Sequence, residues 1–143
     1  MRVMSLTDET KKMSKSDLSS CLFLSDSPDT VQKKLLKAKT DSIDGITYDK
    51  FKRSSLANLI NIYSCLKGQN VDQLVMSASQ LRHRQFKDEI SSFVADYFKD
   101  FRYNYENTSI EYCKEVLRNS RANAHVTASQ TLADVMNKIG FIY

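Results

Sequence analysis

Glycine and proline are scarce in this sequence of 143 residues, which contains three glycines and one proline. Strands, barrels and glycine-rich phosphate loops need these residues at their turns, so their scarcity favours a mostly helical fold. No apolar run approaches transmembrane length, and the amino terminus has no hydrophobic signal region. The three cysteines, Cys21, Cys65 and Cys113, lack the spacing of a zinc site or a disulfide framework. We therefore expect a soluble intracellular protein that does not enter a membrane.

The positive charge of the chain is modest and concentrated toward its start. The sequence has 21 basic and 17 acidic residues, a net charge of +4. Residues 1–53 hold eleven of the basic and eight of the acidic residues, which leaves +3 in the first part of the chain. This distribution favours a polyanionic partner near the front of the chain, and a solvated surface of mixed charge explains it equally well.

Helical periodicity begins after an irregular first segment, whose apolar start at residues 3–6 could be the end of a strand from a larger sheet. Ser27 and Pro28 predict the start of a helix, and a second apolar stripe predicts a helix over residues 56–66 that ends near Gly68. A shorter helix is expected after Asn70. The strongest stripe, which we expect to be core, consists of Phe86, Ile90, Phe93, Val94, Tyr97 and Phe101. A last pair of helices is expected from residue 107, with a stop at Gly140.

The string Lys12-Met13-Ser14-Lys15-Ser16 is the candidate for chemistry. Two lysines three residues apart on a polar loop can converge on one polyphosphate, and the small serines allow backbone amides to approach the same anion. Fixed positive charge at that position suits a reaction in which pyrophosphate leaves, because it stabilises the charge that builds up in the transition state. By its spacing alone, the same string is also typical of a solvated surface loop.

The letters KMSKS match the second signature of class I aminoacyl-tRNA synthetases. The flanking sequence resembles the bacterial and organellar tryptophanyl-tRNA synthetases in several segments that occur in the family's order. These segments are residues 2–8, 11–17, 39–42 with 48–49, 58–64 closed by 67–68, and 111–118 with 121–122. Two departures are that Leu18 and Ser19 follow Asp17 where the family has Pro-Asn, and that the first class I signature, an HIGH-like turn, is absent.

The resemblance implies an ATP site on the loop. Lys12 and Lys15 would hold the ATP phosphates as catalytic residues, with Mg²⁺ sharing the charge. Ser14 and Ser16 would supply hydroxyl and backbone donors. Met13 would lie near the adenine, and Val3 would contact the nucleotide. No metal-binding residue is expected in the chain itself.

The resemblance also implies an organisation in two parts. Residues 1–26 would be the end of a Rossmann-type catalytic domain that carries the KMSKS loop, and residues 27–143 would form a C-terminal helical domain that binds the anticodon arm of tRNA(Trp). Its candidate RNA contacts are Arg82, Arg84, Arg118 and Arg121, although arginines that merely solubilise a helical bundle would give the same pattern. Tryptophan would bind only through the missing N-terminal half. The full-length protein would be a homodimer in the cytoplasm or an organelle matrix.

Two function classes follow. The first is a tryptophan–tRNA ligase, which activates tryptophan with ATP and transfers it to tRNA(Trp), with this chain supplying the phosphate clamp and the tRNA-binding helices but inactive alone. The second is a non-catalytic helical RNA-binding fragment or paralogue that keeps the loop without the active site. Upstream sequence with an HIGH-like motif would discriminate between them.

Overall fold

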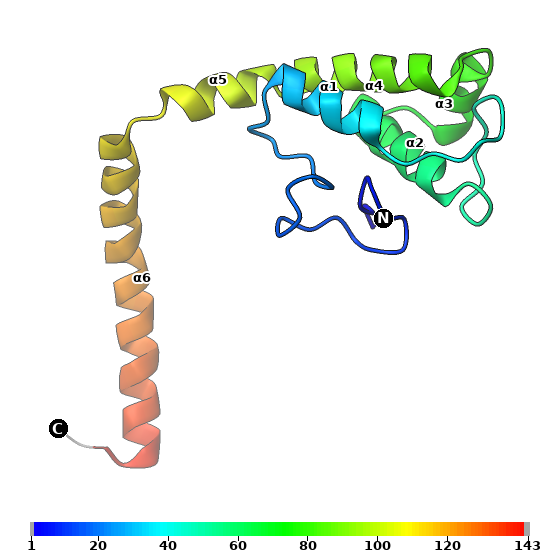
Figure 1. The fold of residues 1–143 in the computed structure, drawn as a ribbon. Coiled ribbons are helices and arrows are strands. Elements are labelled where there is room, and N and C mark those ends of the chain that lie inside the picture. Colours follow the sequence, from blue (N-terminus) through cyan, green and yellow to red (C-terminus); the bar gives the residue numbers. More distant parts are fainter. Residues whose placement is uncertain (1, 142–143) are drawn as a thin grey trace. The chain divides into compact units, whose positions relative to one another are not determined.

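Six helices make up the secondary structure of the computed structural model, which describes residues 2–141 (Figure 1). They are α1 (Pro28–Lys37), α2 (Ser54–Lys67), α3 (Val71–Ala78), α4 (His83–Tyr97), α5 (Lys99–Asn107) and α6 (Ile110–Ile139). Within the described residues there is no strand, and the predicted strand end at residues 3–6 is reduced to one isolated antiparallel bridge between Met4 and Lys12. The prediction of a mainly helical fold is confirmed. Over residues 2–141, none of the helices combines the length and the apolar character that a membrane crossing requires.

The chain divides into two compact units, Met1–Tyr103 and Asn104–Tyr143, and the hydrophobic core lies in the first. In this unit α1 packs along α4, and α2 contacts both α3 and α4. The irregular residues before α1 contribute Leu6, which is 3% exposed, to the same core. The largest fully buried apolar side chains come from all four helices and from the loop before α2: Val31, Leu35, Ile46, Leu56, Leu59, Ile60, Leu74, Phe86, Ile90 and Val94.

The predicted helix ends are confirmed where a cap was visible in the sequence. The Ser27 hydroxyl accepts a hydrogen bond from the amide of Thr30 at the start of α1, with Pro28 in the first helical position. The Asn70 side chain caps α3 in the same manner. Gly68 and Gly140 end α2 and α6 with φ values of 66° and 77°, the left-handed conformation that glycine adopts without steric cost.

The aromatic stripe is core only in its first part. Phe86, Ile90 and Val94 are at most 2% exposed, and Phe93 packs partly buried against them. The expectation is wrong for Tyr97 and Phe101, which are 53% and 43% exposed. α4 ends at Tyr97 and α5 begins at Lys99, so the helical register that the sequence stripe assumes is not continuous across Phe98.

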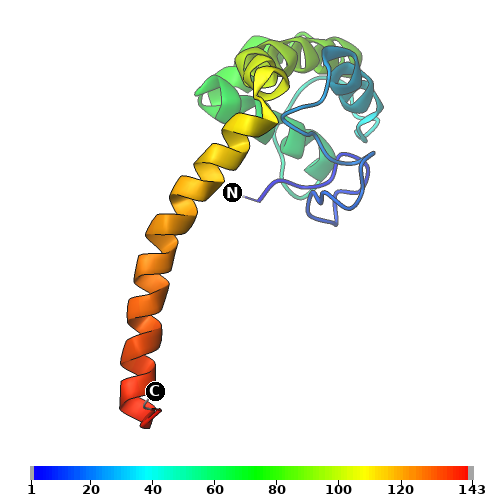
Figure 2. The same cartoon turned by 90° about the vertical axis from the view of Figure 1, so that its left-hand side faces the viewer.

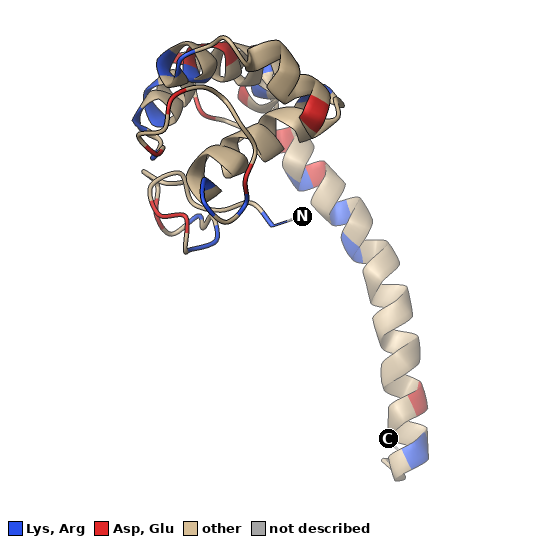
Figure 3. Cartoon of the chain, turned by 90° about the vertical axis from the view of Figure 1, so that its right-hand side faces the viewer, with Lys and Arg blue, Asp and Glu red and all other residues tan. Residues whose placement is uncertain are grey.

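The expected last pair of helices is a single helix. α6 runs without interruption for 30 residues, as Figures 1 and 2 show. Its interior contains no glycine or proline, and alanine, the best helix former, occurs at positions 122, 124, 128 and 133, so nothing stops the helix between its caps. No residue of α6 is buried, and its stretch from Ala122 to Ala133 has no charged side chain, visible in Figure 3 as the long tan segment.

Candidate functional site

The KMSKS segment has a stem, formed by two chain segments that pair side by side, and a turn at its tip. The Ser5 amide donates to the Lys11 carbonyl at 2.9 Å, and the Met13 amide donates to the Val3 carbonyl at 3.1 Å. These bonds flank the Met4–Lys12 bridge and bring the start of the chain against the first half of the motif. Beyond Met13, the amide of Asp17 donates to the Ser14 carbonyl at 3.2 Å and closes a turn over Ser14 to Asp17.

Asn58 of α2 fastens this stem to the helical core. Its side chain is 6% exposed and faces the peptide groups of Met4. The Met4 amide donates to Asn58 Oδ1 at 2.9 Å, and Asn58 Nδ2 donates to the Met4 carbonyl at 2.9 Å. The primary amide therefore occupies both backbone groups of one residue, much as a neighbouring strand would. A second anchor is Leu6, whose carbonyl accepts from the Lys39 amide at 2.8 Å.

Lys12 and Lys15 remain available for an external anion. Both side chains are exposed, and among the described residues neither has a carboxylate oxygen within 4.0 Å. Their neighbours differ, because Lys11 pairs with Asp8 at 3.1 Å and Lys39 pairs with Glu9 at 2.9 Å. The two motif lysines are thus the cations of the loop that no internal ion pair occupies.

The carboxylates of this region are held in their ionised form. Hydrogen bonds from the Thr10 and Lys11 side chains lower the pKa of Asp8 to about 2. The Lys39 ammonium lowers the pKa of Glu9, and the hydroxyls of Ser19 and Ser20 lower that of Asp17. Among residues 2–141, no three acidic, histidine or cysteine side chains form a group that could bind a metal ion. Mg²⁺ is usually held by one or two carboxylates together with the phosphates of its substrate, so the Mg²⁺ expected from the resemblance would be bound to phosphate oxygens.

Ser14 and Ser16 lie on either side of Lys15 in the turn at the tip. The Ser14 hydroxyl accepts a long hydrogen bond of 3.4 Å from the Ser16 amide. Among the described residues, the amides of Ser14 and Lys15 have no hydrogen-bond acceptor. Donors of this kind beside two cations make the tip suitable for an anion.

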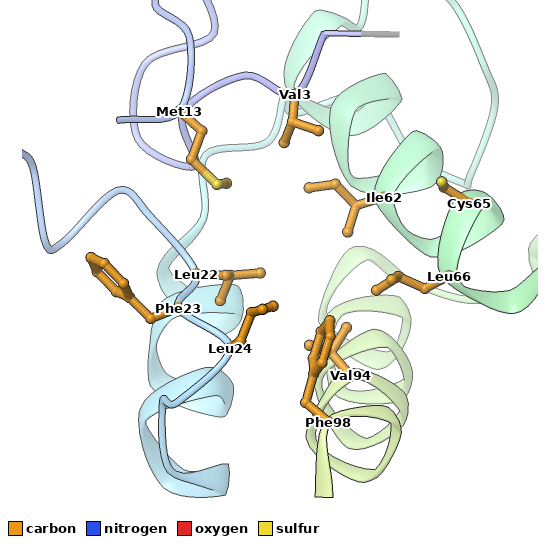
Figure 4. Close-up of a pocket in the computed structure, with 10 residues that line it drawn as sticks. All are labelled: Val3, Met13, Leu22, Phe23, Leu24, Ile62, Cys65, Leu66, Val94 and Phe98. Carbon is orange, nitrogen blue, oxygen red and sulfur yellow. The ribbon is translucent and has the colours of Figure 1, made fainter. Parts of the chain in front are cut away.

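Val3 and Met13 face inward, into an apolar cavity of about 180 Å³ (Figure 4). Their side chains lie opposite Ile62 and Leu66 of α2, and Val94 and Phe98 bound the cavity from the end of α4 and the residue after it. Met13 is half-buried and packs against the hydrophobic core. The structure brings the two residues together, and their side chains share a hydrophobic environment. Their contacts with a nucleotide stay a prediction.

The four candidate RNA-contacting arginines occur as two pairs. Arg82 and Arg84 are exposed at the start of α4, in the first compact unit. Arg118 and Arg121 are exposed about one turn apart on α6, in the second. Arg118 and Arg121 are three residues apart, so they lie on one face of α6. Arg82 is the residue that precedes α4 and Arg84 is the second residue of that helix, so this pair does not share a helix face.

Arg53 is an important residue that sequence reasoning missed. It is 4% exposed and forms a bidentate pair with Asp41, at 3.0 Å from Nε and 2.7 Å from a terminal nitrogen. Its remaining donors bind the carbonyls of Ile43 and Gly45 and the hydroxyl of Thr47, so it organises the whole loop before α2. The sequence feature that could have indicated this role is the position of a basic residue directly before an apolar helix.

Lys87 and Asn58 were also missed as functional or structural residues. Both are next to buried apolar residues in the sequence, Lys87 beside Phe86 and Asn58 between Ala57 and Leu59. A polar residue at a buried position needs a hydrogen-bonding partner, so a polar interruption of an apolar stripe is a detectable signal.

Comparisons with known proteins agree with this geometry. Residues 1–99 match the family model described as tRNA synthetases class I (W and Y). The chain is similar to the tryptophan–tRNA ligase of Caldanaerobacter subterraneus subsp. tengcongensis, with 38% identity over 99% of this chain and 44% of that protein. It is 37% identical to the mitochondrial tryptophan–tRNA ligase of Saccharomyces cerevisiae, over 98% of this chain and 38% of that protein.

A solved structure gives the same result. The tryptophanyl-tRNA synthetase of Mycoplasma pneumoniae superposes with a TM-score of 0.83 at 26% identity, covering 99% of this chain and 46% of that one. The chain thus spans less than half the length of these relatives. Since the family model covers more than half of the 143 residues, the resemblance seen in the sequence is confirmed, and the chain belongs to the class I tRNA synthetase family of W and Y.

Proposed function

We propose that this chain is the KMSKS-bearing part of a tryptophan–tRNA ligase, which activates tryptophan with ATP and transfers it to tRNA(Trp). The observation that carries the proposal is the pair of exposed motif lysines without internal partners, on a stem fastened to the core by Asn58. The names of relatives that match 98–99% of the chain support the choice of amino acid.

The chemical role of the loop is to stabilise a leaving group. In adenylate formation the tryptophan carboxylate bonds to the α-phosphorus of ATP, and the bond to pyrophosphate breaks. Negative charge increases on the pyrophosphate oxygens, where Lys12, Lys15 and the free amides of Ser14 and Lys15 would stabilise it. Mg²⁺ bound to the phosphates would share this charge. Ser16, Met13 and Val3 complete the proposed nucleotide contacts, and Met13 also packs against the core.

The resemblance to the family also suggests which part of the chain has which role. Residues 1–26 would complete the catalytic domain of the whole ligase, and residues 27–143 would form its helical tRNA-binding part. The rest of the ligase would bind tryptophan and form the homodimer. This chain alone should therefore not catalyse tryptophan-dependent exchange between ATP and pyrophosphate, because a charge clamp cannot position a substrate that it does not bind.

A chimera tests the proposal directly. This chain would replace the matching segment of the Caldanaerobacter ligase, and tryptophan-dependent ATP–pyrophosphate exchange would be measured. We expect the chimera to be active, and Lys15→Ala to reduce its rate by about 10²–10³ while tryptophan affinity stays the same. The matched control is Lys99→Ala, which removes an exposed lysine at the start of α5.

Two results would contradict the proposal. Equal losses for Lys15→Ala and Lys99→Ala would show that the motif lysine has no special role. A folded chimera that binds tryptophan but gives no exchange, together with RNA binding by the chain alone, would favour the alternative of a non-catalytic RNA-binding protein.

A further inference from the structure

A second cationic site lies between α1 and α4, apart from the KMSKS segment. It is a cavity of about 360 Å³ lined by Leu36 of α1 and by His83, Arg84 and Lys87 of α4. Positions 83, 84 and 87 are spaced by about one helical turn, so their side chains lie on one face of α4, beside the C-terminal end of α1. Three of the four lining residues are thus potential donors to an anion.

Lys87 is the buried member of this group. Its side chain donates to the Ala38 carbonyl at 2.7 Å and to the Leu36 carbonyl at 3.5 Å, and the residue is 9% exposed. Among residues 2–141 no carboxylate oxygen lies within 4.0 Å of its ammonium nitrogen. Carbonyl dipoles at the end of α1 compensate this buried charge only in part, and burial lowers the pKa of Lys87. An anion in the cavity would supply the missing counter-charge.

Arg84 and His83 offer further donors toward the same space. The Arg84 guanidinium is exposed and forms no ion pair with a described residue. A terminal nitrogen of Arg53 lies 2.9 Å from His83 Nε2. The Asp41 carboxylate, which interacts electrostatically with His83, is paired with Arg53.

The chemistry of the lining selects the kind of anion. It contains three nitrogen-bearing side chains, those of His83, Arg84 and Lys87, and no carboxylate, which could repel an anion or bind ribose hydroxyls. The group that fits is a single phosphate attached to a larger molecule. We propose that the cavity of His83, Arg84 and Lys87 binds one backbone phosphate of an RNA, with Arg84 as the outer contact and Lys87 as the inner one. The choice of RNA rests on the proposed function, which supplies an RNA substrate.

The test measures binding of the full chain to an RNA hairpin with the sequence of the tRNA(Trp) anticodon arm. Fluorescence anisotropy would be recorded over a series of salt concentrations, for the wild type and for Arg84→Gln. We expect Arg84→Gln to weaken binding by about tenfold, the loss of one charged hydrogen bond. The slope of log Kobs against log salt should become shallower by about 0.7–0.9, the value of one phosphate contact.

Lys99→Gln is the matched control, because it removes the same charge beyond the other end of α4. The 15 residues of α4 separate the two sites by about 22 Å of helix. Circular dichroism checks that both variants fold. Inorganic phosphate serves as a competitor, and at millimolar concentration it should reduce RNA binding by the wild type more than by Arg84→Gln.

Each outcome decides the matter. An equal effect of Arg84→Gln and Lys99→Gln would mean nonspecific attraction and would overturn the site. Unchanged binding in Arg84→Gln, with an active chimera, would refute this site and leave the proposed function standing. Absence of any RNA binding by the wild type at low salt, together with an inactive chimera, would remove both.

Discussion

The stem of the KMSKS segment should depend on Asn58. Asn58→Ala removes both hydrogen bonds to Met4 and leaves the amide and carbonyl of Met4 without their partners. At about 1 kcal/mol net for each bond, the free energy of unfolding should fall by about 2 kcal/mol. With a urea dependence of about 2 kcal/mol per molar, the unfolding midpoint should decrease by about 1 M.

The same variant should loosen the stem locally. The Met13 amide, which donates to the Val3 carbonyl, should exchange with solvent faster than in the wild type, while amides in the middle of α4 should change only by the global loss of stability. Asn61→Ala is the matched control, because it removes one hydrogen bond, from the Tyr48 hydroxyl, about one turn further along α2. It should cost about half as much and leave the Met13 amide unaffected.

Asn58→Asp separates hydrogen bonding from packing at this position. The carboxylate can still accept from the Met4 amide, but it presents a second oxygen to the Met4 carbonyl and cannot donate. We therefore expect it to destabilise the chain at least as much as alanine at neutral pH. If Asn58→Ala and Asn61→Ala lower the midpoint equally and Met13 exchange stays at the wild-type rate, the anchoring role of Asn58 is refuted.

Three further predictions concern the fold that supports the site. Arg53→Met should lower the free energy of unfolding by about 3–5 kcal/mol, because it leaves the Asp41 carboxylate without its buried partner. Urea denaturation measures this loss, and a loss below about 1 kcal/mol would contradict the prediction. Hydrogen bonds from Arg53 lower the pKa of Asp41, so this stabilisation is present above the unfolded pKa of about 4 and is lost as the pH falls below it. Denaturation measured between about pH 5 and pH 2 should show this loss in the wild type, and a smaller one in Arg53→Met. Gly68→Ala should lower the free energy of unfolding by about 1 kcal/mol, because φ at this residue is 66°, a conformation that alanine disfavours. Steric contact does not contribute, since no atom lies within 4 Å of the added methyl group, and an unchanged thermal midpoint would contradict the prediction.

The helices that carry their own stop signals could be predicted from the sequence. Each of these signals acts on the backbone of its own helix end, so it can be recognised from a few adjacent residues. They are Ser27 with Pro28, Gly68, Asn70 and Gly140. The last pair of helices was wrong for the opposite reason. Between residue 110 and Gly140 the sequence contains no proline or glycine that would end a helix, so α6 continues where two helices were expected.

The sequence predicts which residues form the candidate site, but it does not predict which residues hold the site in place. The motif letters give Lys12 and Lys15, but Asn58 is 46 residues from Lys12 along the chain, and its partner is the backbone of Met4. Backbone partners leave no trace in the sequence. The same holds for Lys87, whose acceptors are the carbonyls of Leu36 and Ala38. The exposure of Tyr97 could not be predicted from the sequence either, because it depends on α4 ending at that residue.

The KMSKS segment combines a base held by distant parts of the chain with a tip held by local hydrogen bonds among the described residues, an arrangement that suits the phosphate-binding role that we propose. Its base is fixed by side chains and backbone groups from distant parts of the chain, Asn58 on α2 and Lys39 after α1. The tip is different, since the hydrogen bonds of residues 14–19 are made to residues 14–20 among the described part of the chain. Local bonds of this kind move with the tip, so closing on a polyphosphate would break none of the bonds at the base. A charge clamp needs this combination, because its lysines must approach phosphate oxygens within hydrogen-bond distance while the stem keeps their direction fixed.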